Sequence, residues 1–196
     1  MPAKPFVYFW ETVTSKERAK ERADYVLRPI HDYRKNARRI LEIGCGIGEV
    51  LANFPEKYEI YGLDIKKDYI DVCRRRIPKG TFLVSSMHNF KIDRKFDVIF
   101  SADDAINFLE TFTQWKSTFQ SVNDHLSEDG LFIFDIYTPE MLTSEKGKGP
   151  TFRSISKGYY YDKGVVSSAR ALSIEVLCLF KACFHNNTGQ NKKSRN

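Results

Sequence analysis

Residues 41–48, LEIGCGIG, constrain the fold of this chain more than any other stretch. A short apolar run leads into three glycines at alternate positions, Gly44, Gly46 and Gly48. Glycine adopts backbone conformations that are closed to residues with a Cβ, and it lets a ligand approach the main chain closely. The pattern predicts a strand that ends in a tight, ligand-binding loop. A helix that follows the loop would add unpaired N–H groups and a positive dipole end, which suit the carboxylate of an amino-acid-like ligand.

Strand-like and helix-like segments alternate on both sides of this loop. The apolar runs that predict strands are residues 38–44, 58–64, 81–86, 96–102 and 131–137. Alternation of this kind implies right-handed βαβ crossovers and a parallel sheet. The fold class that we expect is α/β: a Rossmann-like, doubly wound, mostly parallel sheet with helices on both faces. Its ligand belongs at the carboxyl ends of the strands.

Helices are predicted from capping residues and from apolar spacing. A capping box at Thr14-x-x-Glu17 opens the first helix, and Pro29 kinks or ends it. Residues 66–76 form another helix. Two further apolar stripes predict helices at 47–54, stopped by Pro55, and at 115–126, closed by a turn at 127–130. The stripes are Ile47, Val50, Leu51 and Phe54, and Trp115, Phe119, Val122 and Leu126.

The C-terminal part of the chain has a weaker pattern. Residues 141–152 read as a loop, residues 158–169 as a β-hairpin that turns at 162–164, and residues 172–180 as a last strand. We therefore expect C-terminal antiparallel strands. The predicted organisation is an N-terminal helical cap or lid over residues 1–38, a ligand-binding domain over 39–184, and a disordered basic tail over 185–196.

Bulk properties place the chain among cytoplasmic globular proteins. Its 196 residues suffice for one domain, no apolar segment is long enough to cross a membrane, and the N-terminus lacks the pattern of a secretory signal. The cysteines, Cys45, Cys73, Cys178 and Cys183, form no CxxC pair, so we expect reduced thiols and no metal site.

The net charge of +6 is concentrated near the N-terminus and in the last residues. Charge runs usually solvate a helix face or a tail, and no RNA-binding signature accompanies this one. We expect neither a nucleic acid nor a membrane as the partner. The sequence does not indicate an oligomeric state.

The spacing of the glycines disfavours a dinucleotide. The dinucleotide fingerprint is GxGxxG, whereas the third glycine position here carries Glu49, whose carboxylate would repel a pyrophosphate. Asp64, at the end of the second predicted strand, is placed to accept hydrogen bonds from ribose hydroxyls. The glycine spacing therefore disfavours NAD as the ligand.

These motifs resemble the class I S-adenosylmethionine (SAM)-dependent methyltransferase superfamily over residues 39 to 137, about half of the chain. LEIGCGIG is similar to that family's first motif and YGLD, residues 61–64, to its ribose-binding motif. HLSEDGLFIFD (125–135) and FDVIFSADDAINFLE (96–110) resemble the segments around strands five and four. The resemblance implies that SAM is the cofactor and a small-molecule methyl acceptor is the partner.

Site residues follow from the resemblance position by position. The glycine loop would line the methionine end of SAM, Glu42 would support that loop, Asp64 would hold the ribose, and Ile65 would pack near the adenine. The full cofactor-binding set is Glu42, Gly44, Cys45, Gly46, Gly48, Asp64, Ile65, Ser86, Met87, Ser101 and Ala102.

Catalytic and acceptor-side candidates come from three segments. Asn107, His88 and Asp135 are candidates for orienting the acceptor or moving a proton. Tyr8 and Trp10 before the first helix, with Asp103 and Asp104 after the fourth strand, are the acceptor-side candidates. The family's NPPY-like tetrapeptide for exocyclic amines of bases or for glutamine is replaced by SADD (101–104), which favours another small metabolite.

Three alternatives remain beside this hypothesis. The chain could be a SAM-binding regulatory or partner subunit without catalysis, an RNA or protein methyltransferase, or an NAD-dependent oxidoreductase. Cofactor binding and turnover separate these classes.

Overall fold

A parallel sheet forms the centre of the protein. The computed structural model describes residue 7, residues 15–136, and the backbone of 151–155, 158–162 and 180–181. The strand order is β3-β2-β1-β4-β5-β8, and every pairing from β3 to β5 is parallel. The strands span β1 (Arg39–Ile43), β2 (Glu59–Asp64), β3 (Thr81–Val84), β4 (Phe96–Ser101), β5 (Leu126–Phe134) and β8 (Phe180–Lys181).

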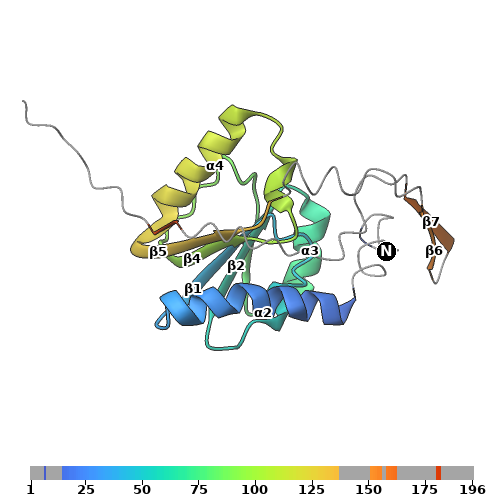
Figure 1. Cartoon of the computed structure of the whole chain (residues 1–196), viewed down its shortest axis with the longest axis horizontal. Helices are drawn as coiled ribbons and strands as arrows, with labels where there is room; N and C mark the ends of the chain where they lie inside the picture. The colour runs from blue at the N-terminus through green and yellow to red at the C-terminus, as the bar shows by residue number, and fades with distance from the viewer. Residues whose placement is uncertain (1–6, 8–14, 137–150, 156–157, 163–179, 182–196) are drawn as a thin grey trace, which may run out of the picture.

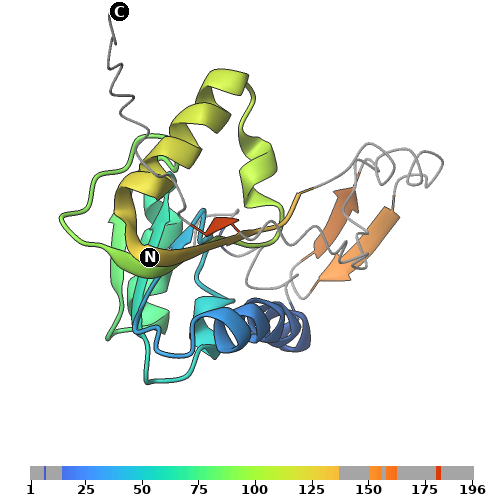
Figure 2. The ribbon, with the colours of Figure 1, turned by 60° about the vertical axis from the view of Figure 1, so that its left-hand side comes forward.

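Helices cover both faces of the sheet (Figures 1 and 2). Residues of α2 (Lys16–Tyr33) and α3 (Lys67–Arg76) share one buried cluster with the strands, and α4 (Phe112–His125) contributes to the other. The strand side chains are buried on both faces, and neighbours along a strand point to opposite faces, which explains the two clusters. The predicted α/β, doubly wound architecture with a parallel sheet of five strands is confirmed.

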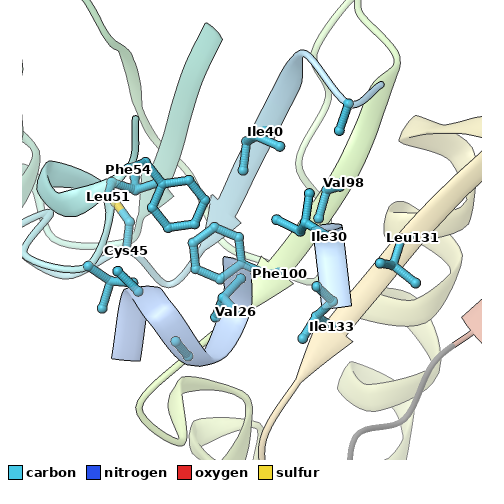
Figure 3. Packing of buried hydrophobic residues seen from close by; sticks show 14 of the residues in the cluster. Val26, Ile30, Ile40, Cys45, Leu51, Phe54, Val98, Phe100, Leu131 and Ile133 are labelled. Atoms are coloured by element: carbon cyan, nitrogen blue, oxygen red, sulfur yellow. The ribbon is translucent and has the colours of Figure 1, made fainter. Parts of the chain in front are cut away.

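The core beneath α2 is built around aromatic stacking (Figure 3). The rings of Phe54 and Phe100 stack with centroids 5.4 Å apart, and Ile30 and Val26 of α2 pack in the same cluster. Phe100 is completely buried at the middle of the sheet. This packing fixes α2 against β4 and β5, so the helix brings its polar residues to the ends of these strands.

The strand order reverses between β1 and β4. From β1 the chain proceeds outward to β2 and β3, and then returns to the other side of β1 as β4. A crevice opens at such a switch point, outside the carboxyl ends of the strands, because the two neighbouring connections leave in opposite directions. The loops that follow β1 and β4 therefore meet at this edge.

The helix predicted at residues 47–54 is wrong. Turns and one 3₁₀ turn, η1 (Leu51–Asn53), occupy the segment, although Ile47, Val50 and Phe54 are buried as the apolar spacing required. Gly48, with φ of +75°, still belongs to the loop, and only residues 49–54 remain before Pro55. So short a segment does not sustain an α-helix, and the helix-dipole argument made for this position fails with it.

The first helix differs from its prediction at two positions. Ser15, rather than Thr14, caps α2, and its Oγ accepts the Arg18 backbone N–H at 3.0 Å. Pro29 does not end the helix, which continues to Tyr33. Burial of Pro29 and Ile30 against the sheet offsets the hydrogen bond that proline removes.

The C-terminal half of the sheet also departs from expectation. The predicted turn at 127–130 is part of β5, where the register shifts between the pairs Phe96–Leu126 and Val98–Leu131. β6 (Thr151–Ile155) pairs antiparallel with β7 (Gly158–Asp162). The turn predicted at 162–164 falls largely outside the described residues and stays a prediction. β8 pairs antiparallel with β5. The predicted tail at 185–196 lies outside the described residues.

The helices that the structure describes include none long and apolar enough to span a membrane.

Replacing Phe100 with alanine should reveal how much the core depends on its aromatic stack. We expect Phe100→Ala to lower the free energy of unfolding by about 3–5 kcal/mol, because a buried ring leaves a cavity. Phe112→Ala is the matched control, since Phe112 is 84% exposed and its loss should cost about 0.5 kcal/mol or less. Urea denaturation measures both, and equal losses would contradict the stated role of Phe100.

Candidate cofactor and acceptor site

The glycine loop curls tightly at the carboxyl end of β1. Gly44, Gly46 and Gly48 have φ values of +74°, +51° and +75°. The backbone N–H groups of Gly44 and Cys45 both donate to the Leu63 carbonyl, at 2.8 and 2.9 Å, which ties the loop to β2. The left-handed conformation at three positions explains why this sequence needs glycine there.

The loop leaves room for a ligand at one of its glycines. A Cβ added at Gly46 would meet nothing within 4 Å, whereas one at Gly44 would lie 2.8 Å from the Ala105 Cβ. Gly44 is therefore needed for contact with the loop after β4. Gly46 faces open space, so a ligand could reach the main chain there, as the sequence predicted.

Asp64 holds the glycine loop from the end of β2. Its Oδ2 accepts the Gly46 N–H at 3.0 Å, and its Oδ1 accepts the Lys66 N–H at 2.8 Å. Burial raises the pKa of Asp64, and these backbone hydrogen bonds partly oppose the rise. Each carboxylate oxygen retains a second lone pair, so the side chain remains able to accept a ribose hydroxyl.

Two thiols pack beneath the same loop. Cys45 Sγ lies 4.0 Å from Cys73 Sγ, and the Cys73 thiol donates to the Gly46 carbonyl at 3.3 Å. The contact with Cys73, followed by burial, raises the pKa of Cys45 well above its usual value. Both are free, buried cysteines, and they pack against the loop.

Glu42 is a buried acid with an unsatisfied oxygen. It is 3% exposed, and within residues 15–136 no hydrogen-bond partner reaches its Oε2. Burial raises the pKa of Glu42 well above its usual value, and the charges of Asp103, Asp64 and Asp135 raise it further. An unpaired buried acid is costly, so a donor group on a ligand would relieve the cost.

The loop after β4 has a strained backbone. Asp103 and Asp104 both have φ of +54°, an uncommon conformation that aspartate tolerates better than most residues. The Asp104 N–H donates to Asp135 Oδ1 at 2.9 Å, and Arg22 of α2 forms an ion pair with Asp103 at 2.9 Å. These contacts hold the loop against the end of β5, where burial also raises the pKa of Asp135.

A small pocket lies between α2 and the ends of β4 and β5. Its free volume is about 10 Å³, which is room for about one water molecule, and Arg22, Tyr25, Ser101 and Asp135 supply its polar lining. Ser101 is 2% exposed, and its Oγ has no hydrogen-bond partner among the described residues. The structure therefore brings the predicted residues Ser101, Ala102, Asp103, Asp104 and Asp135 together at one edge.

Residues on the β2 and β3 side form a more apolar surface. Ile65 is 69% exposed, as a contact for a planar base would require, and Val84 at the end of β3 is also exposed. Met87 is partly buried beside the position that a Gly44 Cβ would occupy. Ser86 Oγ accepts the His88 N–H at 3.5 Å.

The remaining candidates are less closely linked to the crevice. His88 follows β3, and its carbonyl accepts a hydrogen bond from Ser121 of α4. Asn107 lies inside η2 (Ala105–Phe108) in the loop after β4. Tyr8 and Trp10 fall outside the described residues, so their role and the lid boundary at residue 38 stay predictions. Sequence reasoning missed Arg22, which is one cation within a charge run and carries no motif.

The fold and the loops define a domain of the nucleotide-binding α/β class, with its crevice at the carboxyl ends of β1 and β4. Residues 40–130 match a family model described as a methyltransferase domain. This match to a methyltransferase domain, together with the matched relatives, supports the resemblance to the class I SAM-dependent methyltransferase superfamily.

Characterised relatives differ in the acceptor that their names specify. The chain is 26% identical over 100 residues to a dTDP-3-amino-3,4,6-trideoxy-α-D-glucopyranose N,N-dimethyltransferase of Streptomyces venezuelae, covering 50% of this chain and 42% of that protein. It is 31% identical over 111 residues to a malonyl-[acyl-carrier protein] O-methyltransferase of Bacillus anthracis, covering 52% and 38%. The chain spans about half the length of the curated relatives it matches.

A solved structure shares the fold. A SAM-dependent methyltransferase from Clostridium acetobutylicum superimposes with a TM-score of 0.68 at 21% identity, covering 80% of this chain and 66% of that one.

The unsatisfied acid at Glu42 predicts a pH-dependent stability. Its pKa is raised in the folded state above the ordinary value of 4.5, so stability present below pH 4.5 is lost as the pH rises toward the folded pKa. Relative to Glu42→Gln, the wild type should lose up to about 1.4 kcal/mol per pH unit in that window. Urea denaturation of both chains from pH 4 to pH 8 measures the difference. Glu56→Gln is the exposed control, and its free energy of unfolding should depend on pH as that of the wild type does. If Glu42→Gln shows the same pH dependence as the wild type, the raised pKa of Glu42 does not destabilise the fold.

Proposed function

We propose that this chain is a class I SAM-dependent methyltransferase that transfers a methyl group to a small-molecule acceptor. The match of residues 40–130 to a methyltransferase domain supports SAM as the ligand, and the names of the relatives support a small acceptor. A cytoplasmic location and completion of the sheet by C-terminal antiparallel strands remain parts of the proposal.

The open cradle at Gly46 is the observation that carries this proposal. The space beside Gly46, where another residue would place its Cβ, is open. An amino-acid-like group could therefore lie directly against the main chain there. Glu42 offers an unsatisfied oxygen for an ammonium, and Asp64 offers free lone pairs for a sugar hydroxyl. The exposed Ile65 offers an apolar face for a base. The residues present therefore fit SAM.

In this proposal one group of residues binds the cofactor and another orients the acceptor. When bound, SAM supplies an activated methyl group on a sulfonium, so the chain needs no nucleophile of its own. Gly44 and Gly46 would set the main chain close to the amino-acid end, and Asp64 would hold the ribose while it keeps the loop closed. Ser101 and Asp135 would orient the acceptor at the end of β4 and β5.

Gly46→Val should abolish SAM binding while the protein still folds. A valine side chain would fill the open space at Gly46, and its backbone strain should cost about 1–2 kcal/mol of stability. Isothermal calorimetry with SAM and with S-adenosylhomocysteine measures binding, and thermal melting reports folding. If Gly46→Val binds SAM with unchanged affinity, the open space at Gly46 is not part of the SAM site.

Asp64→Ala should weaken SAM binding by about 1–3 kcal/mol, because it removes hydrogen bonds to the ribose and to the glycine loop. Asp93→Ala, an exposed carboxylate between β3 and β4, is the matched control and should bind SAM normally. Equal affinities of the two variants would mean that Asp64 does not serve the ligand. Release of S-adenosylhomocysteine with an acceptor panel would separate an enzyme from a SAM-binding subunit.

A further inference from the structure

Carboxylates gather at the edge of the sheet where the pocket lies. Glu42 comes from β1, Asp103 follows β4 and Asp135 follows β5. Arg22 contacts both Asp103 and Asp135, at 2.9 and 3.8 Å, so these two carboxylates lie close together, and their charges raise the pKa of Glu42. The carboxylates therefore make this edge of the sheet, beside the pocket between α2, β4 and β5, negatively charged.

Arg22 only partly neutralises this edge. Its Nε lies 2.9 Å from Asp103 Oδ1, and its Nη1 lies 3.8 Å from Asp135 Oδ2. One guanidinium thus serves two carboxylates, and the contact with Asp135 exceeds hydrogen-bond distance. Because both carboxylates already compete for Arg22, this guanidinium is not available to an incoming anion.

Unused acceptors point into the same pocket. Asp135 Oδ1 accepts the Asp104 N–H, which leaves Oδ2 with the long contact to Arg22. Ser101 lines the pocket, is 2% exposed, and has no partner for its Oγ among the described residues. A buried hydroxyl without a partner is unusual and indicates a missing ligand.

We propose that this pocket receives the ammonium group of a protonated amine, a group about as large as the water molecule for which the pocket has room, and that it thereby selects an amine as the methyl acceptor. The inference rests on the proposed methyltransferase function and names its substrate class. An ammonium carries donors and no acceptor, so it complements Asp135 Oδ2 and the lone pairs of Ser101 Oγ. Its positive charge is favoured by Asp103 and Asp135, which lie at this edge.

The same electrostatics reject a carboxylate acceptor. An anion placed beside Asp135 would face like charges, an arrangement that costs several kcal/mol at an interface. Its oxygens would also need donors, and Arg22 is engaged. The relatives include an amino-sugar N-methyltransferase and a malonyl-[acyl-carrier protein] O-methyltransferase, and the charges at this edge favour nitrogen chemistry of the first kind.

Asp135 also provides a destination for a proton. An ammonium nitrogen has no lone pair, so it must lose one proton before it attacks a methyl group. Transfer of that proton to Asp135 Oδ2 converts the carboxylate to the acid and the ammonium to the neutral amine, which balances the charge. Burial raises the pKa of Asp135 and so assists this transfer.

Three molecules of one shape test the proposal: cyclohexylamine, cyclohexanol and cyclohexanecarboxylate. Their affinities for the full chain are measured by ligand-observed NMR titration at pH 7, alone and with saturating S-adenosylhomocysteine. We expect the amine to bind about tenfold more tightly than the carboxylate. Equal binding, or preference for the carboxylate, would overturn the inference.

Single-residue variants test which side chains cause the preference for the amine. Asp135→Asn keeps an oxygen for the Asp104 N–H and removes the charge, so it should weaken cyclohexylamine about tenfold and leave cyclohexanol unchanged. Ser101→Ala should weaken the amine less. Asp93→Asn, distant from the pocket, should bind like the wild type. An amine affinity that Asp135→Asn does not change would also overturn the inference, provided that thermal melting shows a folded chain.

Failure of the proposed function gives a different result. If S-adenosylhomocysteine does not bind in calorimetry, the methyltransferase proposal fails, whereas the charge preference is still measured in the titration without it. If S-adenosylhomocysteine binds and the amine is not preferred, only the substrate class is wrong.

Discussion

The site depends on the hydrogen bond from the Gly46 N–H to the carboxylate of Asp64. β1 and β2 are neighbours, but their carboxyl-terminal loops would be independent without this contact and the shared Leu63 carbonyl. Glycine residues lose more conformational entropy on folding than any other residue type. The hydrogen bond to Asp64 helps to offset this cost in the glycine loop. A single carboxylate thereby shapes the loop and remains available to a ligand. The open space at Gly46 depends on that closure, whereas the crevice between β1 and β4 follows from the reversal of strand order.

Negative charge is the second organising feature. Proteins rarely bury acids without partners, because desolvation favours the neutral form. Here Glu42, Asp64 and Asp135 all have raised pKa values from burial, and they occupy the ends of three adjacent or nearly adjacent strands. The cost of keeping them there is understandable if the bound molecules are cations. A sulfonium cofactor and an ammonium acceptor would both satisfy this requirement, so one charged edge serves both.

Sequence alone was sufficient for the parallel sheet and for most of the crevice. The apolar runs of the strands and the positions of Gly44, Gly46 and Asp64 depend on local pattern, which is why they could be predicted. The segment at 47–54 could not be, because its apolar spacing suits both a helix and a series of turns, and the choice depended on the φ of Gly48. Arg22 was missed because its partners Asp103 and Asp135 are distant in the sequence and meet only through the packing of α2.

The left-handed backbone at Asp103 and Asp104 limits how this part of the protein can diverge. Only glycine, asparagine and aspartate adopt that conformation at low cost, and lysine or arginine at either position would be strained. Reversal of charge at this loop would therefore add about 1–2 kcal/mol of backbone strain at each position. Descendants of such a sequence would more readily become neutral here than basic, so the shape of the loop preserves its electrostatic character over evolutionary time.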